Sequence, residues 1–295
     1  MEGDFVILCI VGPTGVGKTK LSIELAKHYN AVIVNGDSMQ VYKRLNIGTA
    51  KVTDEEKENI EHLLFDIVDV NDMYTVYDYQ KDLRRILVEY NDKNIIIVGG
   101  TGLYIKAGLF NYVFSEEENN ETYDNLSNDE LYEMVLKKNK DSDIHINNRK
   151  RMVRFLNRNE NIKDKDKLLY DCKFIGLTTD RDTLYNKINI RVDKMFDDGL
   201  LEEVKELYKE NIRSKAIMTG IGYKELYEYF DGNISLNDAK ELIKQRSRKY
   251  AKRQYTWFNN QMDVKWFNTD YNNFNNTIDD VIKYIEGVIN EENIR

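Results

Sequence analysis

Residues 12–19 read Gly12-Pro13-Thr14-Gly15-Val16-Gly17-Lys18-Thr19 and match the pattern G-x-x-x-x-G-K-[ST] at every position. The apolar run at residues 5–11 predicts a buried strand before them, and residues 18–29 have the apolar spacing of a helix. In this context the loop N–H groups and the helix dipole point at one anion. We therefore expect a phosphate cradle (residues 12–19) that binds a phosphate or diphosphate. Lys18 would reach the terminal oxygens of this phosphate or diphosphate, and the Thr19 hydroxyl would hold Mg²⁺.

The rest of the chain predicts an α/β fold. Residues 31–34, 94–98 and 173–177 are short apolar runs, as strands buried on both faces require, and residues 76–90 have helical spacing. Amphipathic helices are predicted at 182–196, 200–211, 222–230, 237–258 and 277–290, and an edge strand at 263–267. Alternating strands and helices imply a parallel sheet. The predicted architecture is a P-loop NTPase-like parallel sheet flanked by helices.

A change of composition near Tyr112 predicts an insertion in this fold. Residues 115–125 are acidic and rich in Asn, and they are followed by two short helical patterns at 128–138 and 149–158. We expect residues 1–111 and 168–295 to form the P-loop core. Residues 112–167 would form a small, mostly helical insertion domain.

Charge is unevenly distributed along the chain. The 43 Lys and Arg against 51 Asp and Glu give a net charge of −8, which argues against nucleic acid as a partner. Residues 149–158 nevertheless contain five cations, residues 244–253 contain six, and neither segment contains an acid. Such segments are either solvated helix faces or a local site for a polyanion.

Composition excludes several other classes of protein. The apolar run at residues 5–11 is far shorter than the ~20 residues of a membrane-spanning helix. No Lys or Arg stands before this run and a Gly-rich loop follows it directly, so we do not expect it to be a signal peptide. Two Cys and three His are too few for a disulfide framework or a Cys-based zinc module. We expect a cytoplasmic protein that does not associate with a membrane.

Two polar residues follow predicted strands at the edge of the sheet that carries the cradle. The strand at 31–34 leads to Asp37, and the strand at 94–98 leads through Gly99-Gly100 to Thr101. Carboxyl ends of parallel strands line the ligand crevice, so we expect both side chains beside the cradle, although an Asp in a loop is also a common turn former. No Asp ends the strand at 94–98, where a nucleotide hydrolase needs one for Mg²⁺. Nucleotide hydrolysis is therefore not favoured.

Six motifs in order carry a family resemblance. They are G-P-T-G-V-G-K-T (12–19), D-S-M-Q-V-Y-K (37–43), I-G-T-A-K (47–51), V-G-G-T-G-L-Y (98–104), G-I-G-Y-K-E (220–225) and Y-A-K-R-Q-Y-T-W-F (250–258). Together they resemble the tRNA dimethylallyltransferases, also called tRNA isopentenyltransferases, of the bacterial type. The resemblance implies transfer of a dimethylallyl group from dimethylallyl diphosphate to tRNA. The acceptor would be the exocyclic amine of the adenosine 3′ of the anticodon, and diphosphate would be released.

The resemblance also implies roles for individual residues. Asp37 is expected as the general base, with Mg²⁺ ligation through water as a competing role, and Thr101 would lie near the bridging oxygen and the amine. The segment Asp37-Ser38-Met39-Gln40 would read the flipped base. Thr219 stands where the family often has Gln or Arg, and Lys224 would partly take over the role of that side chain. Further tRNA contacts are expected from Lys150, Arg151, Met152, Val153 and Arg154.

Three alternatives remain at this point. An adenylate isopentenyltransferase would share the cradle and the base but act on free nucleotide, and the two basic segments favour a macromolecular acceptor instead. A P-loop kinase of a small metabolite would lack the D-S-M-Q segment. A non-catalytic P-loop protein that binds RNA would leave RNA chemically unchanged. The expected partners are dimethylallyl diphosphate and the anticodon stem-loop of tRNA, bound by a monomer.

Overall fold

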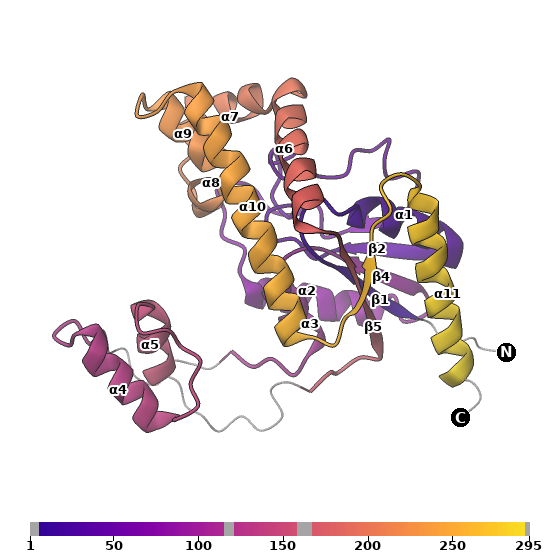
Figure 1. Ribbon diagram of the computed structural model, residues 1–295, viewed down its shortest axis with the longest axis horizontal. Coiled ribbons are helices and arrows are strands. Elements are labelled where there is room, and N and C mark those ends of the chain that lie inside the picture. The colour runs from indigo at the N-terminus through magenta and orange to yellow at the C-terminus, as the bar shows by residue number, and fades with distance from the viewer. Residues whose placement is uncertain (1–5, 115–120, 158–166, 293–295) are drawn as a thin grey trace. The chain divides into compact units, whose positions relative to one another are not determined.

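The computed structural model describes residues 6–114, 121–157 and 167–292 (Figure 1). Phe5, Arg158 and the segments 115–120 and 159–166, on which parts of the expectations fall, lie outside the described residues. The chain divides into two compact units. Unit 1 comprises Met1–Leu109 with Leu168–Arg295, and unit 2 is Phe110–Lys167.

Unit 1 is built on a six-stranded parallel sheet, which confirms the predicted fold class. The strands are β1 (Ile7–Val11), β2 (Ala31–Asn35), β3 (His62–Leu63), β4 (Asn94–Val98), β5 (Cys172–Thr178) and β6 (Lys265–Asn268). Their order is β3-β2-β4-β1-β5-β6. Strand β1 lies between β4 and β5, with Cys9 opposite both Ile97 and Phe174. Burial on both faces explains why this strand is apolar at every position.

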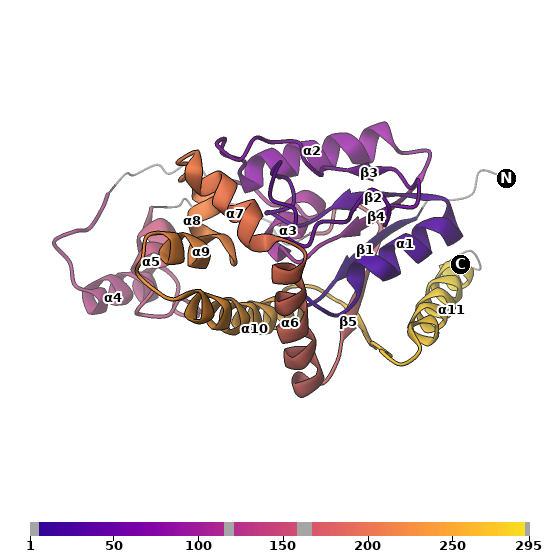
Figure 2. The ribbon, with the colours of Figure 1, turned by 90° about the horizontal axis from the view of Figure 1, so that it is seen from above.

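Helices cover both faces of the sheet. Helix α1 (Lys18–Tyr29) and helix α11 (Phe274–Glu292) share one apolar cluster with the strands, through side chains such as Leu21, Leu25 and Val281. Helices α2 (Val76–Glu89) and α3 (Gly102–Leu109) pack against each other on the other side (Figure 2). A capping box between Thr75 and Asp78 begins α2.

A second helical layer of unit 1 encloses the segment that follows β2. It consists of α6 (Arg181–Asp197), α7 (Leu200–Lys209), α8 (Lys215–Thr219), α9 (Tyr223–Phe230) and α10 (Leu236–Gln261). Val41 and Leu45, which follow the D-S-M-Q segment, are fully buried in one cluster with Leu200, Tyr223 and Leu226. Residues near position 40 are therefore positioned by helices from the second half of the chain.

Unit 2 has its own small core. Helix α4 (Asn128–Lys138) and helix α5 (Arg149–Leu156) pack through Leu131, Val135, Ile144 and Met152. A capping box between Ser127 and Glu130 begins α4, and the Asn148 side chain caps α5.

The sequence patterns did not predict β3, α3 and α8. Strand β3 has two residues and α8 has five, so neither displays a period, and α3 begins at a glycine and contains a second one, Gly108. The edge strand predicted at 263–267 is confirmed as β6, shifted toward the C-terminus by one to two residues. Among the described residues, no helix has the combination of length and apolar character that crossing a membrane requires.

A buried carboxylate links α9 to α10 in addition to their apolar contacts. Glu225 is 1% exposed, accepts a hydrogen bond from the backbone N–H of Gly222 at 2.7 Å and forms an ion pair with Arg246. We predict that Glu225→Ala lowers the free energy of unfolding by about 2–4 kcal/mol, because it leaves Arg246 and a helix N-terminus without their acceptor. Denaturant titration measures the change. Glu228→Ala, at a partly exposed position of the same helix, is the control and should cost less than about 1 kcal/mol.

Candidate functional site

The phosphate cradle has the backbone that anion binding needs. Gly12, Gly15 and Gly17 all have positive φ angles, of 133°, 89° and 93°. A Cβ atom on Gly12 would lie 2.4 Å from the Leu177 carbonyl oxygen, so no other residue fits against β5 there. Helix α1 begins after Gly17 with no side-chain cap. Its first N–H groups are therefore free to bind an external acceptor.

Three charged side chains converge on the cradle. Lys18 Nζ donates to the carbonyls of Gly12 and Pro13 at 3.0 and 2.7 Å. Its pKa is lowered to about 7, first by burial and then by the Arg191 cation, while the Asp37 carboxylate opposes both. Burial likewise lowers the pKa of Arg191, and Asp37 again opposes this. Two cations facing one carboxylate leave a site that an anionic ligand would complete.

Arg191 is a site residue that the sequence did not indicate. It lies on α6, and among the described residues no hydrogen bond or ion pair engages its guanidinium. In the sequence, an arginine with a functional role in an amphipathic helix cannot be distinguished from an ordinary solvent-exposed arginine. Only the packing of α6 against the cradle singles it out.

Asp37 is fixed by a buried asparagine at the end of β2. Asn35 is fully buried, accepts from the Asp37 N–H at 2.8 Å, and donates to the carbonyls of Asp37 and Leu64. Asp37 Oδ1 accepts from the Met39 N–H at 2.9 Å, which leaves Oδ2 for other partners. Asp37 lies near Lys18, as expected, since its carboxylate opposes the lowering of the Lys18 pKa. Asp37 therefore forms a turn through its Oδ1 atom and still has its Oδ2 atom available in the site.

Thr101 joins the same cluster. Its hydroxyl oxygen accepts from the Ser38 N–H at 2.9 Å, and the hydroxyl donates to Ser38 Oγ at 3.1 Å. The Tyr250 phenol also lies here. Burial and the nearby Asp37 carboxylate raise its pKa, whereas hydrogen bonds with Thr101 and Gln254 lower it. The loops after β2 and β4 thus meet, as the parallel sheet predicted.

Gln254 ties the cradle to the loop after β4, a role that the sequence did not indicate. Gln254 is 5% exposed and lies on α10. Its Oε1 accepts from the Thr14 N–H at 2.9 Å, and its Nε2 donates to the Gly100 carbonyl at 3.1 Å. A Cβ atom on Gly100 would lie 2.0 Å from that Nε2, so the contact requires glycine.

The other residues expected to read a base are partly engaged within the protein. Gln40 Nε2 donates to the Thr49 carbonyl at 3.0 Å and lies 3.5 Å from that of Ala50. Met39 packs into the second helical layer, and Lys224 on α9 is partly exposed with no resolved partner among the described residues. Thr219 is exposed and donates to the Lys215 carbonyl at 2.7 Å.

Neither basic segment presents all of its cations to solvent. On α10, Lys244 pairs with Asp193 and Arg246 pairs with Glu225, which leaves Lys249, Lys252 and Arg253 exposed. Only part of the 244–253 segment is therefore available to a polyanion. Ion pairs that hold α10 in the fold use part of its charge.

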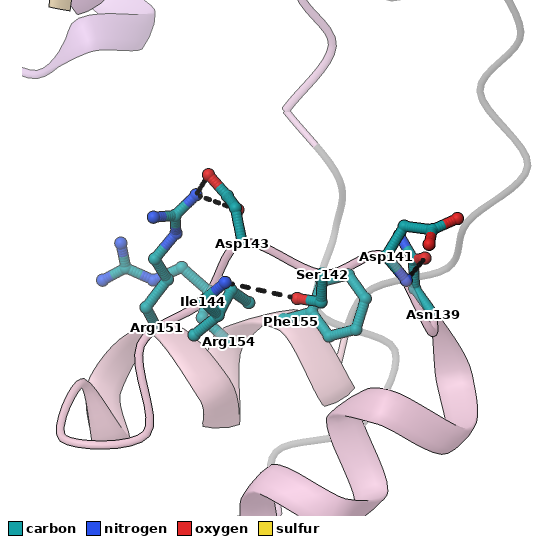
Figure 3. Close-up of a pocket in the computed structure, with 8 residues that line it drawn as sticks. All are labelled: Asn139, Asp141, Ser142, Asp143, Ile144, Arg151, Arg154 and Phe155. Carbon is teal, nitrogen blue, oxygen red and sulfur yellow. Dashed lines mark hydrogen bonds and ion pairs between the residues drawn. The ribbon is translucent and has the colours of Figure 1, made fainter.

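In unit 2 the basic helix borders a pocket (Figure 3). The cavity has a volume of about 390 Å³ and is lined by Arg151, Arg154 and Phe155 together with the loop at 139–144. Arg151 Nη2 donates to both carboxylate oxygens of Asp143, at 2.9 and 3.2 Å. Lys150 and Arg154 are exposed, and the structure gives Arg154 no ion pair within the described residues.

Met152 lies on the opposite side of this helix. It is fully buried in the core of unit 2, and Val153 is half-buried against the same cluster. The expectation that Met152 contacts RNA through its side chain is therefore corrected: the side chain supports the helix. Arg149 is also structural, because it donates to the Tyr123 carbonyl and to Asn128.

The donor set at the cradle suits Mg²⁺ better than a transition metal. The described residues contain no cluster of three or more His, Cys, Asp or Glu that could enclose a metal ion. Mg²⁺ keeps several waters and takes one or two protein oxygens together with phosphate oxygens. The Thr19 hydroxyl, at the exposed start of α1, and the free Oδ2 of Asp37 fit that pattern.

Comparison with known proteins decides the family. Residues 40–261, more than half of the chain, match the family described as IPP transferase. The chain belongs to this family. The tRNA dimethylallyltransferase of Anoxybacillus flavithermus is 46% identical over 299 residues, covering 95% of this chain and 96% of the relative. That of Bacillus subtilis is 46% identical, with coverage of 88% and 90%.

Solved structures of the family have the same fold. A tRNA isopentenylpyrophosphate transferase from Bacillus halodurans superimposes with a TM-score of 0.78 at 38% identity, covering 98% of each chain. A eukaryotic dimethylallyltransferase acting on tRNA superimposes with a TM-score of 0.72 at 27% identity, covering 89% of this chain and 74% of the other. The family resemblance inferred from the motifs is confirmed.

The Gln254 bridge generates a test of the cradle. We predict that Gln254→Leu lowers the free energy of unfolding by about 1–3 kcal/mol, because it leaves a buried N–H and a buried carbonyl unpaired. It should also weaken pyrophosphate binding in calorimetry, since the loop at Thr14 loses its anchor. Gln261→Leu, at the exposed end of the same helix, serves as the control. Equal behaviour of the two variants would contradict the bridge.

Proposed function

We propose that this protein transfers the dimethylallyl group of dimethylallyl diphosphate to the exocyclic amine of the adenosine 3′ of the anticodon in tRNA. The observation that carries the proposal is the convergence of the cradle, Lys18 and Arg191 on one side with Asp37 and Thr101 on the other. Membership in the IPP transferase family and relatives named tRNA dimethylallyltransferase support it.

The cradle would hold the leaving group. When the allylic C–O bond breaks, its electron pair goes to the bridging oxygen and negative charge grows on diphosphate. The open N–H groups of α1 and the two cations, Lys18 and Arg191, would stabilise that charge. Bound Mg²⁺, held by the Thr19 hydroxyl, would add Lewis-acid stabilisation of the same oxygens. Ligation of this ion by Asp37 through water is the role that competes with its role as base.

Asp37 would act on the nucleophile. The amine of adenine is a poor nucleophile because its lone pair is delocalised into the ring. As the new C–N bond forms, the amine loses a proton, which Asp37 would accept at Oδ2, since Oδ1 is engaged by the Met39 N–H. The Thr101 hydroxyl, oriented by the Ser38 N–H, would hold the amine or the bridging oxygen in line.

Unit 2 would contribute contacts to the RNA backbone. Lys150, Arg151 and Arg154 are exposed on one short helix, and guanidinium groups bind phosphate through paired N–H donors. The same basic face would be without purpose in an enzyme that acts on free adenosine monophosphate. A macromolecular acceptor is therefore favoured.

Mass spectrometry of nucleosides tests the proposal directly. Bulk tRNA is incubated with the protein, Mg²⁺ and dimethylallyl diphosphate, then digested. We expect adenosine that carries one dimethylallyl group on its exocyclic amine. A parallel reaction with adenosine monophosphate should give much less product. If only adenosine monophosphate gives product, the protein is an adenylate isopentenyltransferase instead.

The role of Asp37 gives a further prediction. Asp37→Ala should retain binding of the anticodon stem-loop, while product formation falls at least about 10²-fold, in line with the loss of a general base. Single-turnover kinetics and a filter-binding assay measure the two quantities. Asp72→Asn, an exposed acid with no role in the site, controls for charge. Near-normal turnover would remove Asp37 from its catalytic role.

Two substitutions at the pocket of unit 2 should change the affinity for the stem-loop in opposite directions. Arg154→Ala should weaken stem-loop binding and reduce the slope of log affinity against log salt by about 1, the value for one phosphate contact. Asp143→Asn should strengthen binding by up to about fivefold, because it frees Arg151 from an exposed ion pair. Glu133→Gln on α4 makes the same charge change away from the pocket. If it strengthens binding as much as Asp143→Asn does, the specific role of Asp143 is excluded.

A further inference from the structure

A carboxylate from α7 binds the turn that follows the D-S-M-Q segment. Glu203 Oε2 accepts from the backbone N–H groups of Asn46 and Ile47 at 3.1 and 2.8 Å. Glu203 Oε1 accepts from the Gly48 N–H at 3.1 Å and from the Tyr223 hydroxyl at 2.6 Å. Three successive backbone N–H groups around one anion form a nest. Nothing in the proposed chemistry accounts for this carboxylate.

The turn at residues 46–51 fits closely around that contact. Tyr223 is fully buried, and a Cβ atom on Gly48 would lie 2.6 Å from its ring. At the other end of the turn, the buried Lys51 ammonium donates to the Tyr42 carbonyl at 2.7 Å and to Asp66 at 2.5 Å. The backbone of the turn is therefore held from both ends.

The turn at residues 46–51 orients the side-chain amide of Gln40. Gln40 Nε2 donates to the Thr49 carbonyl at 3.0 Å, with the Ala50 carbonyl at 3.5 Å. Because carbonyl oxygens only accept hydrogen bonds, the amide nitrogen must face them and the amide cannot flip. Gln40 Oε1 is left as the free acceptor, with no hydrogen bond to the rest of the described chain.

We propose that Glu203 is a positioning residue for recognition of the target adenosine. It acts through the nest and the turn at 46–51, which hold the Gln40 amide with its oxygen available to the base. The inference rests on the proposed function, because it assigns Gln40 to the base that is modified. Loss of the Glu203 charge releases the turn and lets the Gln40 amide rotate, so RNA recognition weakens while the cradle is untouched.

Steady-state kinetics of three variants test this. Glu203→Gln removes the charge and places an amide against N–H donors, and it should raise KM for the anticodon stem-loop about tenfold or more, as expected for lost hydrogen bonds to a charged group. Tyr223→Phe keeps the buried ring and removes one donor, so a rise of roughly threefold is expected. KM for dimethylallyl diphosphate should stay unchanged in both. Glu202→Gln, an exposed neighbour on α7, should leave all constants unchanged.

A double-mutant cycle separates positioning from general stabilisation. In a Gln40→Ala background, Glu203→Gln should cause no further rise in KM for RNA, because the residue it acts through is absent. A merely structural role of Glu203 gives additive effects in this cycle, or raises both KM values together, and either result overturns the proposal. If Glu203→Gln fails to fold, the same cycle is run with Tyr223→Phe.

The wild-type protein distinguishes this inference from the proposed function. If the wild type makes no modified tRNA, the proposed function itself fails, whatever the variants of the double-mutant cycle show. If the wild type is active and Glu203→Gln and Tyr223→Phe both match Glu202→Gln, only the role of Glu203 is overturned. Melting temperatures of all variants show whether a change in KM follows a loss of folded protein.

Discussion

The open N-terminus of helix α1 is the constraint around which unit 1 is arranged. Gly17 ends the loop in a left-handed conformation and supplies no side-chain cap, so the first N–H groups of the helix need an external acceptor. Lys18 and Arg191 add two cations at the same place. Such a site is incomplete without an anion, and in the part of the chain that the structure describes its charged counterpart is the Asp37 carboxylate.

The second half of the chain completes what the sheet begins. Helix α6 supplies Arg191, helix α10 supplies Gln254 and Tyr250, and helix α7 supplies Glu203. Each reaches a loop at the carboxyl edge of the sheet through hydrogen bonds or charge, not through apolar packing alone. Since these contacts are directional, they fix backbone groups that would otherwise be free in a loop.

Charge in this protein has to serve both folding and binding. Lys244 and Arg246 are used in ion pairs that secure α10, and Arg149 holds the chain of unit 2 together. Within the two basic segments, Arg154, Lys249 and Arg253 are among the cations that remain exposed, whereas Arg151 is paired with Asp143. An acidic protein with cations concentrated in two short segments would be suited to bind a polyanion locally without attracting nucleic acid over its whole surface.

By itself the sequence determined the parallel sheet, the phosphate cradle and the meeting of Asp37 with Thr101. These follow from short-range patterns: apolar runs mark strands buried on both faces, glycines mark the loop, and parallel strands bring their carboxyl ends to one edge. Only the tertiary structure decided the roles of Arg191, Gln254 and Glu203, and the burial of Met152. The partners of the first three lie far away along the chain. For Met152, the family resemblance assigned all of residues 150–154 to RNA and did not separate the buried face of the helix from the exposed one. A side chain's partner depends on how helices pack, and the local sequence does not encode that packing.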